Sequence, residues 1–385
     1  MSALGHIASF KVVRNKQGGR DLPWSKEQNS LLSTDRLSQA KQIIHSWEEF
    51  SKSPLISLCD YALDLDVLEV LYKDEGSRFG INTFKVLGGA YAVFKYLQTE
   101  TTRADTSELA ANTTFVSATD GNHGRSVAWG CQKAGSSCVI VLPDEVSLGR
   151  RKSLELLGAK LILHPGTFDD CVLLASKLAK ENGWVEISDT AHNETDPIPS
   201  DVMQGYEISS SEVVEQLHRP PTHVFVQAGV GGFAASVTGH FKRTFGSKRP
   251  MIIIVEPMTA GCCFQSFQSG RRSRQEGDLE TLMGGLACGE VSLFAWEILK
   301  DHADAAMVIS DDEVAETMKL LALESAHRQP IVAGEAGVAS LIGAMNACKC
   351  EETRDILKID TTSRILVYGT EADTDPELYK SLIGV

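Results

Sequence analysis

The strongest constraint on the fold is a regular alternation of short apolar runs with longer helical patterns, beginning near Val67. The runs are of strand length and rich in β-branched residues, while the segments between them carry apolar residues at helical spacing. In the first half of the chain the runs are VLEVLYK, TTFVSA, SCVIVLP and AKLILHP. Strands that alternate with helices form parallel sheets with helices on their faces. The sequence therefore predicts an α/β protein with parallel or mostly parallel sheets covered by helices.

The alternation is interrupted by a loop over residues 189–200 and then resumes with the runs THVFVQAG, MIIIVEP and RILVYGT. There is no repeat of fixed period and no low-complexity tract, so the two halves are interpreted as two lobes of one protein. We expect a large discontinuous domain, residues 1–85 and 190–385, and a small domain, residues 86–189, inserted within it. A cleft between two lobes is a common place for a small ligand.

The charge of the chain argues against polyanionic partners. The formal net charge is -14 and the isoelectric point is about 5.2, and the one short basic cluster is Arg271, Arg272 and Arg274. Such a surface repels nucleic acid unless a basic patch overrides it. No apolar run approaches the roughly 20 residues that span a bilayer, and the first residues lack a signal-peptide pattern. We therefore expect no nucleic-acid or membrane partner and a cytoplasmic location.

The nine cysteines are scattered along the chain, with no CxxC pair and no histidines at ligand spacing. A structural zinc site needs four ligands at characteristic spacing. No metal site is therefore expected. Most of these thiols are interpreted as small buried hydrophobes, and a cytoplasmic location favours their reduced form.

A glycine-rich loop, AGVGGFA, follows the predicted strand VFVQ and leads into a predicted helix. Residues without Cβ atoms let backbone N–H groups approach a phosphate, and the helix N-terminus favours the negative charge. The loop also fits the dinucleotide pattern G-x-G-x-x-A through Gly229, Gly231 and Ala234, with Glu256 about 20 residues later. A tight turn without a ligand is a further alternative. By itself the loop therefore leaves an NAD-dependent oxidoreductase open as an alternative.

Two further segments carry candidate chemistry. Lys85 lies in NTFKVLGG, between apolar neighbours at the start of a predicted helix. A lysine in such a place is usually only a solvated charge, but partial burial would let it act as a neutral amine. The second segment, TDGNHG, follows the predicted strand TTFVSA. Its N–H groups and side-chain donors could bind a carboxylate, although an ordinary helix cap explains the same residues.

Taken together, these motifs resemble those of the fold-type-II, tryptophan synthase β-like enzymes that use pyridoxal 5'-phosphate (PLP). The likeness is greatest to the diaminopropionate ammonia-lyases. It covers about residues 55–376 in order, through NTFKVLGG, TDGNHGR, AGVGGFA, MGGLACGE, AGEAG and GTEADTDP. Any one of these motifs is weak, whereas their combination is specific. The resemblance implies a two-lobed fold of this type with PLP as cofactor.

The resemblance also implies roles for individual residues. Lys85 would form the imine with the cofactor and transfer protons, and Asn122 would contact the cofactor's ring oxygen. Thr370, in GTEADTDP, would be an uncharged partner of the pyridine nitrogen, which favours elimination because the ring is then a weaker electron sink. The phosphate would be held by Gly229, Val230, Gly231 and Gly232, and the substrate would be bound by Thr119, Asp120, Gly121 and His123. His123 is expected to hold its loop rather than to move protons.

Asp120 and Asp189 match acidic positions of the family. The resemblance implies that Asp120 is a base on the face opposite the lysine, and two bases on two faces would allow both enantiomers of a substrate to react. Asp189, in ISDTA, is the other catalytic candidate, although a residue at this place could also simply cap the turn after a strand.

The stretch HNETDPIPSDVMQGY departs from the family pattern at residues 192–197, which puts the substrate in question. The reaction implied by the resemblance is α,β-elimination on a small amino acid, most simply 2,3-diaminopropionate to pyruvate and two ammonia. Glu194 or Asp189 could then recognise the cationic β-amine. Serine, threonine or hydroxyaspartate dehydratases and amino-acid racemases are alternatives within the fold, and a non-catalytic amino-acid-binding relative is an alternative outside this class of enzymes. Cys262 and Cys288 fall where the family can carry a cysteine pair, and a homodimer is expected.

Overall fold

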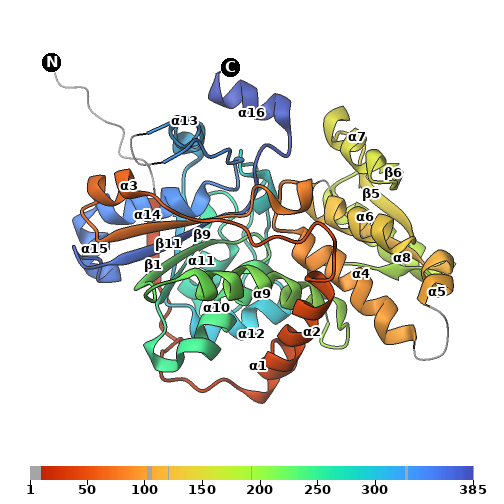
Figure 1. The fold of residues 1–385 in the computed structure, drawn as a ribbon, viewed down its shortest axis with the longest axis horizontal. Coiled ribbons are helices and arrows are strands. Elements are labelled where there is room, and N and C mark those ends of the chain that lie inside the picture. Colours follow the sequence, from red (N-terminus) through yellow and green to blue (C-terminus); the bar gives the residue numbers. More distant parts are fainter. Residues whose placement is uncertain (1–9, 102–105, 120, 192, 326–327, 385) are drawn as a thin grey trace. The chain divides into compact units, whose positions relative to one another are not determined.

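A computed structural model describes residues 10–101, 106–119, 121–191, 193–325 and 328–384. The chain packs into two compact units, each with its own sheet (Figure 1). Unit 1 comprises Ser53–Gly76 and Ser210 onward together with the chain up to Trp24, and unit 2 comprises Ser25–Lys52 and Ser77–Ser209. These bounds differ from the division at 85/86 and 189/190, which remains a prediction about domains, because unit 2 also takes in residues 25–52 and continues to Ser209.

Unit 1 is built on a seven-stranded sheet with the order β1-β10-β9-β8-β11-β3-β2. Its five inner strands run parallel, and only the edge strands β1 and β2 are antiparallel to their neighbours. Figure 1 shows that β1 and β11, from opposite ends of the chain, belong to this one sheet. The strands are β1 (Phe10–Arg14), β2 (Leu55–Ser57), β3 (Glu69–Asp74), β8 (His223–Gln227), β9 (Met251–Pro257), β10 (Ala305–Ile309) and β11 (Arg364–Gly369).

The inner strands β8, β9 and β10 are buried along their whole length, which explains why they read as continuous apolar runs rather than alternating ones. The helix α14 packs against β8, β9, β10 and β11. Gly343 allows its close approach, since a Cβ there would lie 2.7 Å from Val255 Cγ2. The helices of this unit are α3 (Cys59–Asp64), α10 (Gly232–Phe245), α11 (Cys262–Ser269), α12 (Leu293–His302), α13 (Val314–Ala322), α14 (Ala339–Lys349), α15 (Glu351–Leu357) and α16 (Pro376–Ile383), with 3-10 turns η3 (Gly246–Lys248), η4 (Gly284–Leu286) and η5 (Asp311–Glu313).

Unit 2 contains a fully parallel four-stranded sheet with the order β6-β5-β4-β7. Figure 1 shows α7 and α8 in this unit together with β5 and β6, and both helices pack against the sheet. The strands are β4 (Thr114–Ala118), β5 (Ser137–Pro143), β6 (Lys160–His164) and β7 (Val185–Glu186). The helices are α1 (Lys26–Leu31), α2 (Thr34–Ile44), α4 (Val86–Glu100), α5 (Thr106–Asn112), α6 (Asn122–Ala134), α7 (Leu148–Leu156) and α8 (Phe168–Asn182), with a 3-10 turn η1 (Arg78–Gly80); α9 (Ile198–Gln216) contributes to both units.

The helices α4 and α6 lie unusually close together because both carry glycine where they meet. A Cβ on Gly130 would lie 2.7 Å from the Cα of Ala90, and a Cβ on Gly89 would overlap the hydroxyl of Ser126. Since Lys85 precedes α4 and Asn122 begins α6, this packing fixes the N-terminal ends of two helices that carry candidate residues.

The predicted fold class is confirmed, since parallel and mostly parallel sheets are flanked by helices. Within the described ranges, none of the helices combines the length and the apolar character that crossing a membrane requires.

Candidate active site

Lys85 lies at the N-terminal cap of α4, where two aromatic rings flank its amine. Its Nζ lies 5.8 Å from the ring centroids of both Phe84 and Tyr206, and the side chain is 20% exposed. The backbone just before it is strained, because Phe79 and Asn82 adopt left-handed φ angles of 51° and 60°. The amine therefore lies in a partly buried, largely aromatic setting.

The carboxylate of Asp189 lies against this amine, with Lys85 Nζ donating to Asp189 Oδ2 at 2.6 Å. Thr190 Oγ1 donates to the other oxygen, Oδ1, at 3.2 Å. Burial acts to raise the pKa of Asp189, but the Lys85 ammonium, His123 and these hydrogen bonds outweigh it and hold the pKa well below its usual range. The structure thus pairs two of the three predicted catalytic residues, which are 104 positions apart in the chain.

His123 is the third member of this cluster. Its Nε2 lies 3.0 Å from the carbonyl oxygen of Ile187, and its Nδ1 lies 4.0 Å from Asp189 Oδ2. The side chain is 7% exposed, and burial lowers the pKa of the imidazole. The bond to Ile187 ties α6 to the segment that follows β7.

The loop that leads into α6 is organised by Thr119. Its hydroxyl accepts hydrogen bonds from the N–H groups of Gly121 at 3.2 Å and Gly124 at 3.3 Å. Asn122 begins the helix, and its Oδ1 accepts a bond from Arg125 Nη1 at 3.4 Å. Asp120 lies outside the described residues. The substrate contacts expected of Thr119, Asp120, Gly121 and His123 therefore remain predictions.

In unit 1 the glycine-rich loop joins β8 to α10, as the sequence predicts. Gly231 has φ +87°, a left-handed conformation that favours glycine, and a Cβ on Gly229 would lie 2.9 Å from Cys288 Sγ. Val230 O accepts a hydrogen bond from Ser292 N at 2.9 Å, which fixes the loop. Within the described chain no side chain caps the start of α10. Its first N–H groups and the missing Cβ atoms fit a phosphate, so residues 229–232 suit the phosphate of PLP.

Thr370 follows β11 and is 3% exposed. Its hydroxyl accepts a hydrogen bond from Gln227 Nε2 at 2.9 Å, and the same Nε2 also contacts the carbonyl oxygens of Ala336 and Tyr368. Because the Thr370 oxygen accepts that bond, its O–H remains able to donate to an acceptor such as the unprotonated pyridine nitrogen expected of the cofactor. Gln227 was not predicted as a site residue, although its place as the last residue of β8, next to the glycine loop, is a usable signal.

Glu256, the acidic residue of the NAD alternative, has an internal role. It is fully buried at the end of β9, and its oxygens accept the N–H groups of Cys263 at 2.7 Å and Phe264 at 2.8 Å. Burial raises its pKa to about 7, although these bonds act in the opposite direction. A carboxylate that caps α11 in this way is not available to a ribose hydroxyl, which removes the main support for the NAD reading.

Glu256, Cys262 and Cys263 could together offer three metal ligands, since their donor atoms lie within 4.8 Å of one another. The hydrogen bond with Cys262 acts to lower the pKa of Cys263, but burial and Glu256 outweigh it and raise that pKa to about 11. None of the nine cysteines, all within the described ranges, forms a disulfide.

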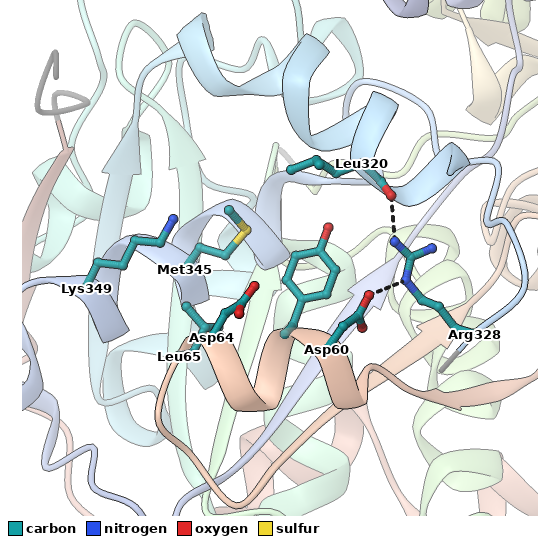
Figure 2. A pocket seen from close by; sticks show the side chains of 8 residues that line it. Asp60, Asp64, Leu65, Leu320, Arg328, Met345 and Lys349 are labelled. Atoms are coloured by element: carbon teal, nitrogen blue, oxygen red, sulfur yellow. Dashed lines mark hydrogen bonds and ion pairs between the residues drawn. The ribbon is translucent and has the colours of Figure 1, made fainter. Parts of the chain in front are cut away.

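A hollow of about 170 Å³ lies elsewhere in unit 1, lined by residues of α3, α13 and α14 and by Arg328 (Figure 2). Arg328 donates to Asp60 Oδ2 at 3.2 Å and to the carbonyl oxygens of Leu320, Leu321 and Leu323. Figure 2 shows its guanidinium between Asp60 and Leu320. The hollow is lined by none of the predicted site residues that the structure describes. Its arginine links the end of α13 to α3, which is a structural role.

Sequence reasoning missed the aromatic contact of Lys85 with Tyr206, because the two residues are far apart in the chain. A Cβ on Gly88 would overlap the Tyr206 ring. Gly88, three residues after Lys85, is therefore the feature of the sequence that reflects this packing. Glu194, suggested as a partner for a β-amine, is exposed. It lies in a turn organised by Asn193 Oδ1, which accepts from the N–H groups of Thr195 and Asp196.

Comparison with known proteins gives consistent matches. The family described as "Pyridoxal-phosphate dependent enzyme" matches residues 48–359. The diaminopropionate ammonia-lyase of Salmonella typhimurium is 36% identical over 357 residues, covering 87% of this chain and 88% of that protein. The crystal structure of the holo diaminopropionate ammonia-lyase of Escherichia coli has a TM-score of 0.88 and 33% identity, covering 98% of this chain and 97% of that one. The same enzyme in complex with an aminoacrylate–PLP azomethine reaction intermediate has a TM-score of 0.87 at the same identity and coverage.

Proposed function

This chain belongs to the diaminopropionate ammonia-lyase family of PLP-dependent enzymes, and from that premise we propose that it converts 2,3-diaminopropionate to pyruvate and two molecules of ammonia by α,β-elimination. Its cofactor is PLP. Similarity to lyases over almost the whole chain supports the reaction, and the pairing of Lys85 with Asp189 is the structural observation that carries it.

PLP, when bound, supplies an electron sink for the pair released when the substrate loses its α-proton. The uncapped start of α10 and the backbone of residues 229–232 would hold its phosphate. Thr370 would donate its hydroxyl proton to the ring nitrogen, and Asn122 would contact the ring oxygen. A neutral hydroxyl leaves that nitrogen unprotonated, which weakens the sink and favours loss of the β-substituent over other outcomes.

Lys85 is the residue we assign to cofactor attachment and to proton transfer at the α-carbon. Both tasks require the neutral amine, although the ion pair with Asp189 favours the ammonium, and the rings of Phe84 and Tyr206 help to bury Nζ. Asp189 acts through Lys85, since its carboxylate fixes the position of Nζ at 2.6 Å. Asp120, which lies outside the described residues, is proposed as the base on the opposite face.

The substrate is the least constrained part of the proposal, because residues 192–197 depart from the family pattern. A dehydratase for serine, threonine or hydroxyaspartate and an amino-acid racemase are the competing activities within this fold. We expect the β-amine of the substrate, rather than a β-hydroxyl, to be the leaving group. Homodimer formation and a cytoplasmic location also remain proposals, which light scattering and cell fractionation would test.

A substrate panel tests the activity. Holoenzyme is incubated separately with D- and L-2,3-diaminopropionate, serine, threonine and hydroxyaspartate, and ammonia and keto acid are measured. Ammonia and pyruvate in a ratio of about two to one from diaminopropionate support the proposal, and turnover of both enantiomers supports two bases. Turnover of the hydroxy amino acids alone would replace it with the dehydratase. The variant Lys85→Ala controls for contaminating activity.

A further inference from the structure

The hydrogen bonding of His123 fixes which of its ring nitrogens carries the proton. Nε2 lies 3.0 Å from the carbonyl oxygen of Ile187, and that oxygen also accepts the Ser117 hydroxyl at 2.7 Å. A carbonyl oxygen only accepts, so Nε2 must carry hydrogen. In a neutral ring this leaves Nδ1 as a bare acceptor.

Nδ1 is buried and has an unfavourable neighbour. Among the described residues it has no hydrogen-bond partner, and Asp189 Oδ2 lies 4.0 Å from it. Two atoms that both present lone pairs face each other across this gap, with no proton between them. A buried acceptor without a donor is costly, so a proton on Nδ1 would turn that atom into a donor facing Asp189 Oδ2.

Lys85 has the opposite problem. It must be a neutral amine to bond the cofactor or to accept the α-proton, yet a carboxylate 2.6 Å from Nζ favours the ammonium. Release of that proton to water would leave a net negative charge in a cluster whose members are between 7% and 21% exposed. A proton that moves within the cluster leaves its net charge unchanged, which avoids this cost.

We propose that His123 takes up the proton of Lys85 through Asp189, so that the neutral amine forms without a change in net charge. The N–H bond of Nζ breaks with its electron pair left on Nζ, Oδ2 carries the proton, and an N–H bond forms with the lone pair of Nδ1. The 4.0 Å gap between Oδ2 and Nδ1 must shorten by about 1 Å for this transfer. The imidazolium then donates from Nε2 to Ile187 and from Nδ1 to Asp189. His123 is a positioning residue, since it acts through Asp189, and its assignment rests on the proposed function.

The electrostatic setting is consistent with this transfer. Burial lowers the pKa of His123, Asp189 raises it and the Lys85 ammonium lowers it. Loss of the Lys85 charge therefore removes an effect that opposes protonation of the ring. Asp189 and Lys85 are the charged side chains that act on His123 among the described residues, and Asp120 lies outside them.

The variant His123→Gln provides the test. The glutamine amide can still donate to Ile187 O but has no basic nitrogen at the Nδ1 position. The measurement is the rate at which apoenzyme develops the visible absorption band with excess PLP, followed against pH, which requires no turnover. In the wild type this rate should change little with pH, because the reactive state needs no net loss of a proton. In H123Q it should rise about tenfold per pH unit and approach the wild-type rate at alkaline pH, because Lys85 must then lose its proton to water.

Ser126→Ala is the matched control. The Ser126 hydroxyl donates to the carbonyl oxygen of His123 at 2.6 Å, so this variant disturbs the same turn of α6 without removing a titratable group. It should keep the flat profile of the wild type. Circular dichroism checks that each variant folds. If H123Q does not fold, Asp189→Asn replaces it, and its rate should show the same tenfold rise per pH unit.

Equal pH slopes in H123Q and the wild type would overturn the proposal. That failure is distinguishable from failure of the proposed function, because it leaves the attachment of PLP to Lys85 in the wild type intact. Attachment of PLP to another lysine would instead refute the function itself.

Discussion

At the scale of single residues, the site depends on polar atoms held by neighbours that are distant in sequence. Asp189 is placed against Lys85, and Thr370 is oriented by Gln227 Nε2. The resemblance supplied the residue types, since the motifs carry them locally. It could not supply the partners, because Gln227 ends β8 and Thr370 directly follows β11, two strands that meet only in the folded sheet.

Thr370→Ala should weaken PLP binding. The change leaves Gln227 Nε2 with one acceptor fewer and the cofactor nitrogen without a donor, at a cost of about 1–3 kcal/mol, or roughly tenfold to hundredfold in dissociation constant. Fluorescence titration of apoenzyme with PLP measures the effect. Thr370→Ser keeps the hydroxyl and should bind almost as the wild type does, and equal weakening in both variants would show that the hydroxyl is not the relevant group.

Glu256 predicts a pH dependence of stability. Its folded-state pKa of about 7 lies above the ordinary value of 4.5, so between these values the folded protein binds more protons than the unfolded chain. Stability due to this group is therefore fully present below about pH 4.5 and is lost as the pH rises through 7, by up to about 3 kcal/mol. Urea denaturation at a series of pH values measures this. A Glu256→Gln variant should lack this decline, and an equal decline in both proteins would assign it to other groups.

At the scale of secondary-structure elements, the apolar runs predicted the strands well. The runs VFVQ, MIIIVEP and RILVYG all form strands of one sheet, and the predicted turn AGVGGFA joins β8 to α10. What the sequence could not give is the interlocking of elements by polar side chains. Arg328, which links α13 to α3, belongs to no motif.

Arg328→Ala should destabilise unit 1 without altering PLP attachment. The change leaves the carbonyl oxygens at the end of α13 and the carboxylate of Asp60 without their donor, at a cost of about 2–4 kcal/mol. The free energy of unfolding in urea measures it. Lys349→Ala, an exposed residue of the same hollow (Figure 2), is the control and should change that free energy by at most about 0.5 kcal/mol. If Arg328→Ala also lowered the free energy of unfolding by no more than about 0.5 kcal/mol, the structural role of Arg328 would be contradicted.

At the scale of the whole molecule, the α/β class followed from the alternation of strands and helices alone. The assignment of residues 25–52 to unit 2 did not follow from that alternation. Residues 25–52 join unit 2 through long-range contacts, such as the ion pair of Arg36 Nη2 with Asp201 Oδ1 at 2.8 Å. A local sequence pattern does not predict a pairing between residues so far apart in the chain. The PLP assignment came from the order of six motifs, which is a property of the whole chain rather than of any one segment.

The central claim is that PLP is bonded to Lys85, and reductive labelling tests it most directly. Holoenzyme is treated with borohydride, digested and examined by mass spectrometry, with Lys85→Ala as the control. We expect the reduced cofactor on the peptide that contains Lys85, and no labelled lysine in the variant. Label on a different lysine, or none in wild-type protein saturated with PLP, would contradict the account.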